Sequence, residues 1–138
     1  MGNIDLSQKI ISVAFDGKLD KGGKPYVEHL RRVASNFKEE NTIISALLHD
    51  LLEDCKHWSK ESISNVFGTT IAEIVDILTK KIDETYDDYI ERVSSDWRAK
   101  SIKTKDLEDN MDIKRLINIT DTDVIRLRKY HKAWIKLK

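Results

Sequence analysis

The sequence has few of the residues that cross-link, break or sharply turn a chain. Among its 138 residues are one cysteine, Cys55, one proline and five glycines. A single cysteine excludes an internal disulfide and fits a reducing compartment. The sequence has no run of about 18 apolar residues, and its N-terminus lacks the apolar segment of a signal peptide. We therefore expect a cytoplasmic protein with no membrane-spanning segment.

Neither sign of charge predominates. Lysine and arginine together number 24, as do aspartate and glutamate, so nothing indicates binding to nucleic acid or to an anionic membrane. Alternating β-branched residues are scarce too, and with so little proline and glycine this composition favours an all-α fold. The length suits one domain over residues 1–138, long enough to bury a core. The oligomeric state cannot be read from these features.

Apolar residues recur instead at helical spacing along most of the chain. The predicted helices are 4–15, one that begins at Pro25 and runs to Phe37, 42–54, a short helix capped by Ser59 and ended by Gly68, one capped by Thr69 or Thr70, 86–93, 99–116, and a last helix capped within 120–123.

The segment Ala46–Asp54 carries the strongest sign of chemistry. In a continuous helix, His49 and Glu53 stack one turn apart, and so do Asp50 and Asp54. An imidazole and three carboxylates that close repel one another unless a cation or hydrogen-bond donors offset the charge. Nitrogen and oxygen ligands suit manganese, iron, zinc or magnesium. A solvated polar helix face is the alternative, and this segment alone leaves both open.

Two further segments could complete such a site. His29 lies at the border of its helix's apolar stripe, where a histidine is either a packing residue or a ligand offered to a facing helix. Asp106, Asp109 and Asn110 fall three to four residues apart on one face of a later helix. These acids either meet the edge that carries His49 or pair with neighbouring lysines at the surface.

A glycine-rich loop at residues 16–24 could bind an anion. It contains three glycines together with Lys18, Lys21 and Lys24, and glycines let backbone N–H groups approach a ligand closely. The alternative is an ordinary solvated turn.

Four segments, taken in their order and spacing, resemble the small HD-domain phosphohydrolases of the RelA/SpoT homologue group, the guanosine 3′,5′-bis-pyrophosphate (ppGpp) hydrolases. The segments are Asp20–His29, Ala46–Asp54, Val75–Thr79 and Lys103–Asn110. The likeness covers nearly the whole chain. It implies an all-α HD-domain helical bundle with a central metal site.

The resemblance also implies roles for particular residues. One divalent ion, usually manganese in this family, would be held by His29, His49, Asp50 and Asp106. Two imidazoles and two carboxylates leave positions open for water and substrate, as a catalytic site requires. Glu53 and Asp54 match the acidic pair that activates and orients the attacking water. The substrate would be contacted by Lys21, Asn110 and Tyr130.

The chain departs from the family pattern at three positions. Leu30 follows the first histidine where many relatives have proline, and Asp16 and Asp20 stand where many have basic residues. The two acids make the expected phosphate pocket less basic. The resemblance therefore predicts metal-dependent hydrolysis of ppGpp to pyrophosphate and GDP. The alternatives are hydrolysis of another nucleotide phosphate ester, such as a phosphorylated dinucleotide, and a module that senses a nucleotide without turnover.

Overall fold

The computed structural model describes residues 2–138, which form a bundle of helices. The helices are α1 (Asn3–Ala14), α2 (Val27–Ala34), α3 (Glu40–Leu47), α4 (Leu51–Asp54), α5 (Lys60–Phe67), α6 (Thr69–Ile77), α7 (Tyr86–Ser94), α8 (Trp97–Asn110), the 3₁₀-helix η1 (Ile113–Arg115) and α9 (Asp121–Leu137). No strand occurs in the described residues, where β-type pairing is limited to one bridge between Leu19 and Pro25. The predicted all-α class is confirmed. Nor does any helix within residues 2–138 have the length and apolar character needed to cross a membrane.

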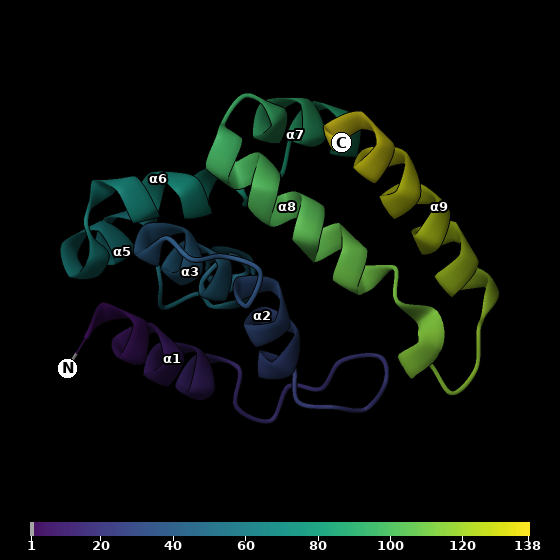
Figure 1. Ribbon diagram of the computed structural model, residues 1–138, viewed down its shortest axis with the longest axis horizontal. Coiled ribbons are helices and arrows are strands. Elements are labelled where there is room, and N and C mark those ends of the chain that lie inside the picture. Colours follow the sequence, from purple (N-terminus) through teal and green to yellow (C-terminus); the bar gives the residue numbers. More distant parts are fainter. Residues whose placement is uncertain (1) are drawn as a thin grey trace.

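Two helices organise the packing. The helix α3 packs against α1, α2 and α6, whereas α8 packs against α2, α7 and α9. In Figure 1, α1 and α9 lie on opposite sides of the molecule with α2, α3 and α8 between them. Helices from the two halves of the chain therefore meet at its centre.

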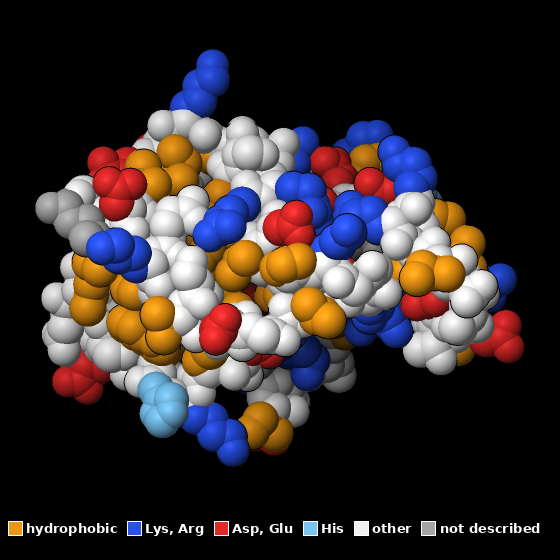
Figure 2. Space-filling model, turned by 90° about the horizontal axis from the view of Figure 1, so that it is seen from below, with side chains coloured by type: hydrophobic (Ala, Val, Ile, Leu, Met, Phe, Trp, Pro, Cys, Tyr) orange, Lys and Arg blue, Asp and Glu red, His pale blue; other side chains and the backbone are white. Residues whose placement is uncertain are grey.

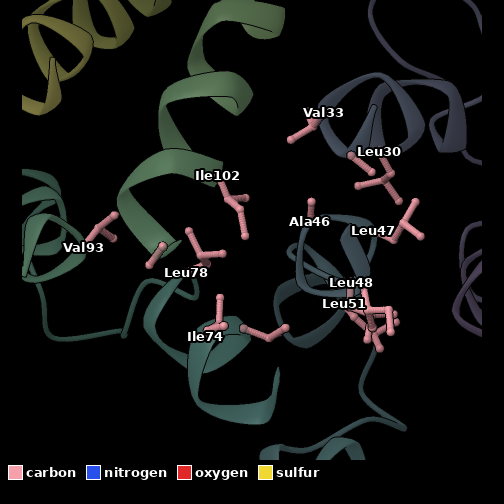
Figure 3. Packing of buried hydrophobic residues seen from close by; sticks show 14 of the residues in the cluster. Leu30, Val33, Ala46, Leu47, Leu48, Leu51, Ile74, Leu78, Val93 and Ile102 are labelled. Carbon is pink, nitrogen blue, oxygen red and sulfur yellow. The ribbon is translucent and has the colours of Figure 1, made fainter. Parts of the chain in front are cut away.

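The apolar core fixes α2, α3 and α8 relative to one another. Figure 3 shows Leu30 and Val33 of α2, Ala46 of α3 and Ile102 of α8 around the space between these helices, with Leu47 on the other side of α3, and all five belong to one buried cluster. All five side chains are at most 1% exposed. Burying each of the larger ones contributes roughly 1.5–3 kcal/mol relative to leaving it in water. The same three helices carry or border the polar site described below.

The predicted continuous helix over 42–54 is wrong. Helix α3 ends at Leu47, and α4 begins only at Leu51. Between them, the His49 amide reaches the Ala46 carbonyl oxygen at 3.4 Å, and the Leu51 amide reaches that of Leu48 at 2.9 Å, so both hydrogen bonds span three residues rather than four. The His49 ring nitrogen Nδ1 also lies 2.6 Å from the Ala46 oxygen. The side chain thus takes the acceptor that would continue the helix.

Two other predicted boundaries are also wrong. Pro25 does not begin α2, because it pairs with Leu19 across the glycine-rich loop two residues before the helix starts. The predicted helix over 99–116 ends at Asn110. There, Asp112 accepts a hydrogen bond from the Lys114 amide at 3.2 Å and caps a separate 3₁₀ turn.

The capping predictions have mixed outcomes. Ser59 and Thr120 cap α5 and α9, each in a reciprocal capping box. Gly68 ends α5 as predicted, but it also precedes α6 directly, so neither Thr69 nor Thr70 caps that helix. Gly68 has φ +96°, which L side chains rarely adopt, and this lets one residue join two helices without a spacer.

Candidate metal centre

Two histidines and a carboxylate converge in the centre of the molecule. His29 comes from α2, His49 from the turn between α3 and α4, and Asp106 from α8. The Nε2 atom of His29 lies 3.0 Å from Asp106 Oδ1, and the Nε2 atom of His49 lies 3.2 Å from the same oxygen. One potential ligand atom of each lies within 4.8 Å of the others. All three side chains are buried, so the predicted meeting of α2, the His49 segment and α8 is found in the structure.

Asp50 lies beside this cluster. Its Oδ2 atom is 3.3 Å from His49 Nε2 and accepts a hydrogen bond from the Tyr26 hydroxyl. Burial, and then the charge of Asp50, raise the pKa of Tyr26, so the phenol stays protonated and donates. In the described residues Asp50 is not part of the three-residue convergence. Its role as a fourth ligand therefore stays a prediction.

The outer nitrogen of each histidine also has a partner. His29 Nδ1 lies 2.6 Å from Asp109 Oδ2, and His49 Nδ1 lies 2.6 Å from the carbonyl oxygen of Ala46. Both Nε2 atoms consequently face Asp106. Metal-ligating histidines in proteins are usually held in this way, through the ring nitrogen that does not bind the ion.

The protonation of the two rings tests whether a divalent ion fits. Burial lowers the pKa of His29, but hydrogen bonds to Asp106 and Asp109 outweigh it and raise that pKa to about 9. Burial likewise lowers the pKa of His49, but the charges of Asp50 and Asp106 raise it overall. The carboxylates of Asp50 and Asp106 therefore favour positive charge at the two imidazoles. A divalent cation supplies positive charge at the same place, and the pair of Nε2 atoms and the Asp106 carboxylate are suitable ligands, so the donor set fits such an ion.

Lys103 completes the surroundings of Asp106. Its ammonium nitrogen lies 2.8 Å from Asp106 Oδ2 and 5.3 Å from the centre of the Tyr89 ring, while Asn110 donates to Asp106 Oδ1 at 3.2 Å. Burial raises the pKa of Asp106, but the charges of Lys103 and His49 hold it well below its usual value. The sequence suggested a lysine partner only as a surface alternative. The i, i+3 spacing was the available signal, and in the structure Asp106 is buried and the Lys103 side chain is only 13% exposed.

Glu53 and Asp54 follow on α4. Glu53 is exposed and accepts a hydrogen bond from the Lys80 amide at 3.1 Å, and partial desolvation together with the charge of Asp50 raises its pKa. Asp54 pairs with Lys18 at 2.9 Å. A carboxylate with a raised pKa accepts a proton more readily, which suits Glu53 to general-base chemistry.

A cavity of about 390 Å³ lies next to the cluster, between the glycine-rich loop and the region around η1 and the start of α9. It is lined by all three residues predicted to contact substrate, namely Lys21, Asn110 and Tyr130. Its basic side chains are Lys18, Lys21, Arg115 and Arg126, and its acidic ones are Asp20, Asp112 and Asp123. Figure 2 shows Lys and Arg side chains gathered over the loop that follows α1. Asn110 and Tyr26 belong to the cavity wall, and they donate hydrogen bonds to Asp106 and Asp50 respectively, so the cavity adjoins the His/Asp cluster.

The acidic residues of the glycine-rich loop have different positions. Asp20 Oδ1 accepts hydrogen bonds from the amides of Gly22 and Lys24, each at 2.9 Å, and so holds the loop in its turn. Asp16 is exposed and is not among the residues that line the cavity, and neither is Lys24. Only Asp20 therefore reduces the positive charge of the cavity in the way predicted for both acids.

The family model described as an HD domain matches residues 5–115. This chain belongs to the HD-domain family. The HD-domain chain is also 35% identical over 71 residues to a guanosine-3′,5′-bis(diphosphate) 3′-pyrophosphohydrolase of Haemophilus influenzae, an alignment covering 49% of this chain and 10% of that protein. It is 37% identical over 103 residues to a protein of the same name from Aquifex aeolicus, covering 66% of this chain and 15% of the relative.

The HD-domain chain also shares its fold with a solved structure. That structure is described as a metazoan orthologue of SpoT that hydrolyses ppGpp. The TM-score is 0.82 at 21% sequence identity, with 99% of this chain and 85% of the other covered. The predicted HD-domain helical bundle is therefore confirmed, and a His/Asp cluster lies at its centre, where the resemblance implied a metal site. The curated relatives are much longer, since this chain spans only 10% and 15% of the two named above.

Proposed function

We propose that this HD-domain chain is a metal-dependent phosphohydrolase of a nucleotide, and that its reaction is hydrolysis of the 3′-pyrophosphate of ppGpp. The observation that carries the proposal is the buried convergence of His29, His49 and Asp106 next to a cavity lined by four basic and three acidic side chains. The names of the relatives from H. influenzae and A. aeolicus support the choice of substrate.

The ion we propose is Mn²⁺, with Asp50 as the fourth protein ligand. Imidazole nitrogen and carboxylate oxygen are ligands that manganese accepts. When bound, such an ion polarises phosphoryl oxygens and lowers the pKa of water. Lys103 keeps Asp106 ionised, so that its carboxylate is available to the ion.

The remaining roles follow from where the side chains lie. Glu53 takes the proton from the attacking water, and Asp54, held by Lys18, orients that water. The water oxygen joins the phosphorus attached to the 3′ oxygen, the phosphorus–oxygen bond to the sugar breaks, and the 3′ oxygen takes up a proton. The products are pyrophosphate and GDP. The nucleotide is held by Lys21, Asn110 and Tyr130.

The test is an assay of the purified chain with Mn²⁺ and ppGpp, with both products quantified. We expect pyrophosphate and GDP in equal amounts, and we expect the His49→Ala variant to lose both bound metal and turnover. A chain that binds manganese stoichiometrically yet releases no phosphate or pyrophosphate from any nucleotide would instead be a sensing module.

A second substrate class is favoured by one observation. Asp20, Asp112 and Asp123 line the cavity among its basic residues and offset much of their charge. A ligand with fewer phosphate charges than ppGpp, such as a phosphorylated dinucleotide, suits this balance better. The same assay run across nucleotides separates the two, because phosphate release from a monoester differs from pyrophosphate release from ppGpp.

A further inference from the structure

Asp109 holds the outer nitrogen of His29 and is itself held by two arginines. It lies on α8 three residues after Asp106, so these two carboxylates reach the two nitrogens of one ring, at 2.6 Å and 3.0 Å. Arg32 donates to both oxygens of Asp109, at 2.8 Å and 3.1 Å. Arg115 donates to the Asp109 carbonyl at 3.0 Å. The carboxylate is thus fixed from several sides before it meets the imidazole.

Such a contact has a specific chemical consequence at a metal ligand. An imidazole that binds a cation through Nε2 must carry its remaining proton on Nδ1. An acceptor fixed at Nδ1 selects this tautomer, prevents the ring from turning over and increases the basicity of the ligating nitrogen. His49 has only the neutral carbonyl of Ala46 in that place, whereas His29 has a carboxylate.

We propose that Asp109 is a positioning residue that holds His29 with Nε2 directed at the bound ion. This inference rests on the metal site of the proposed function but not on its substrate. The spacing of the sequence placed Asp109 on a helix face as an acid that could meet the edge carrying His49 or pair with surface lysines, but it did not predict a contact with His29. Arg115 also lines the adjoining cavity, so one of the two arginines that hold Asp109 belongs to the proposed nucleotide-binding cavity as well.

The test is the affinity for Mn²⁺, measured by titration calorimetry on the full chain at fixed pH. Loss of a residue that supports a metal ligand typically weakens binding about 10- to 100-fold. We expect that range for Asp109→Ala and a smaller loss for Asp109→Asn, whose amide oxygen can still accept from Nδ1. The matched control is Glu108→Gln, which removes the neighbouring carboxylate on α8. Glu108 pairs with Lys105 and Trp134 and does not contact His29, so its variant should bind Mn²⁺ normally.

The outcomes separate the two proposals. If Asp109→Asn and Asp109→Ala lower the melting temperature but bind Mn²⁺ as tightly as the unaltered chain, the role is structural and the inference is overturned. An unaltered chain that binds no divalent ion overturns it as well. If the Mn²⁺ affinity falls from the unaltered chain to Asp109→Asn and then to Asp109→Ala, but the unaltered chain does not hydrolyse ppGpp, the inference stands and the proposed substrate is rejected.

A measurement on the unaltered chain covers the case in which the variants fail to fold. In ¹⁵N-correlated NMR spectra of the Zn²⁺-loaded protein, we expect the His29 Nδ1 proton to be retained and shifted downfield by its short hydrogen bond. The exposed His57 provides the comparison, because its ring N–H protons exchange freely with water. A His29 ring that binds zinc through Nδ1, or whose Nδ1 proton exchanges with water as fast as that of His57, overturns the inference.

Discussion

At the scale of single residues, the site separates its two kinds of carboxylate by their surroundings. Asp106 is buried and kept ionised by Lys103 and the histidines. Glu53 is exposed, and its pKa is raised by partial desolvation and by the charge of Asp50. A carboxylate that stays ionised, like Asp106, can bind a cation. A carboxylate with a raised pKa, like Glu53, can more readily accept a proton. Two environments thus assign two roles to chemically similar side chains.

We predict that Glu53→Gln keeps the bound metal but loses turnover. The amide preserves the shape of the side chain and can still accept the Lys80 amide hydrogen, but it cannot take a proton from water. General-base groups typically contribute about 10²- to 10⁴-fold to rate, so we expect a loss of that order in kcat. Metal content by elemental analysis provides the control. An unchanged rate would show that another group accepts the proton.

Because of His29 and His49, we predict that stability changes with pH in opposite directions for the metal-free and the metal-loaded protein. The pKa of His29 is raised from 6.5 to about 9 in the metal-free fold. A histidine whose pKa is higher in the folded chain than in the unfolded chain stabilises the fold fully at pH values below its unfolded-state pKa. This stability is lost as the pH rises through its folded-state pKa. With a chelator present, the melting temperature should therefore fall between about pH 6.5 and 9.

With Mn²⁺ the trend reverses, because the ion competes with the Nε2 protons and its affinity rises over the same range. Melting curves at several pH values, with chelator and with Mn²⁺, check both trends. The exposed His57 provides a control, since His57→Gln should keep both profiles. Parallel curves with and without Mn²⁺ would contradict the assignment of these imidazoles as ligands.

At the scale of elements, the glycine-rich loop lies directly against η1. A Cβ atom at Gly22 would lie 2.9 Å from the carbonyl oxygen of Arg115, which is backbone and cannot rotate away. Larger side chains at this position must push the loop off η1, and Lys21 moves with it. The close approach of the two segments therefore sets the shape of the cavity.

We predict that Gly22→Ala lowers kcat/KM by about tenfold or more, since displacing substrate-binding groups by about 1 Å can cost up to about 10²-fold. The affinity for Mn²⁺ should not change, because the loop does not supply a proposed ligand. Gly23→Ala is the matched control. It has φ +81° but nothing within 4 Å of a new Cβ, so it strains the loop without touching η1. Equal losses in both variants would argue against the contact with Arg115.

Helix periodicity predicted the existence of most elements but not the break that shapes the site. The apolar spacing through 42–54 indicates one helix, and Leu47, Leu48 and Leu51 are indeed all buried. Periodicity cannot predict that the His49 ring competes for the Ala46 carbonyl, because this is a contact between a side chain and the backbone. The same limit applies after Asn110, where the Asp112 side chain begins a new turn.

At the scale of the whole molecule, the sequence resemblance placed residues from three helices in one cluster, and the structure brings His29, His49 and Asp106 together. It did not identify Asp109 or Lys103, because their roles depend on which neighbours the folded helices bring to them. The cytoplasmic location and the single-domain organisation over residues 1–138 stay predictions.

The ligands also lie far apart along the chain. His29 and Asp106 are separated by 77 residues, and His49 and Asp106 by 57. An ion that joins them acts as a reversible cross-link between the two halves, and at 100 times its Kd it adds about 2.7 kcal/mol of stability. We predict that chelation increases amide hydrogen exchange in α2 and α8 together, while α5, which carries none of the ligands, exchanges as before. The ion proposed for catalysis would then also hold the two halves of the fold together and suppress their local opening.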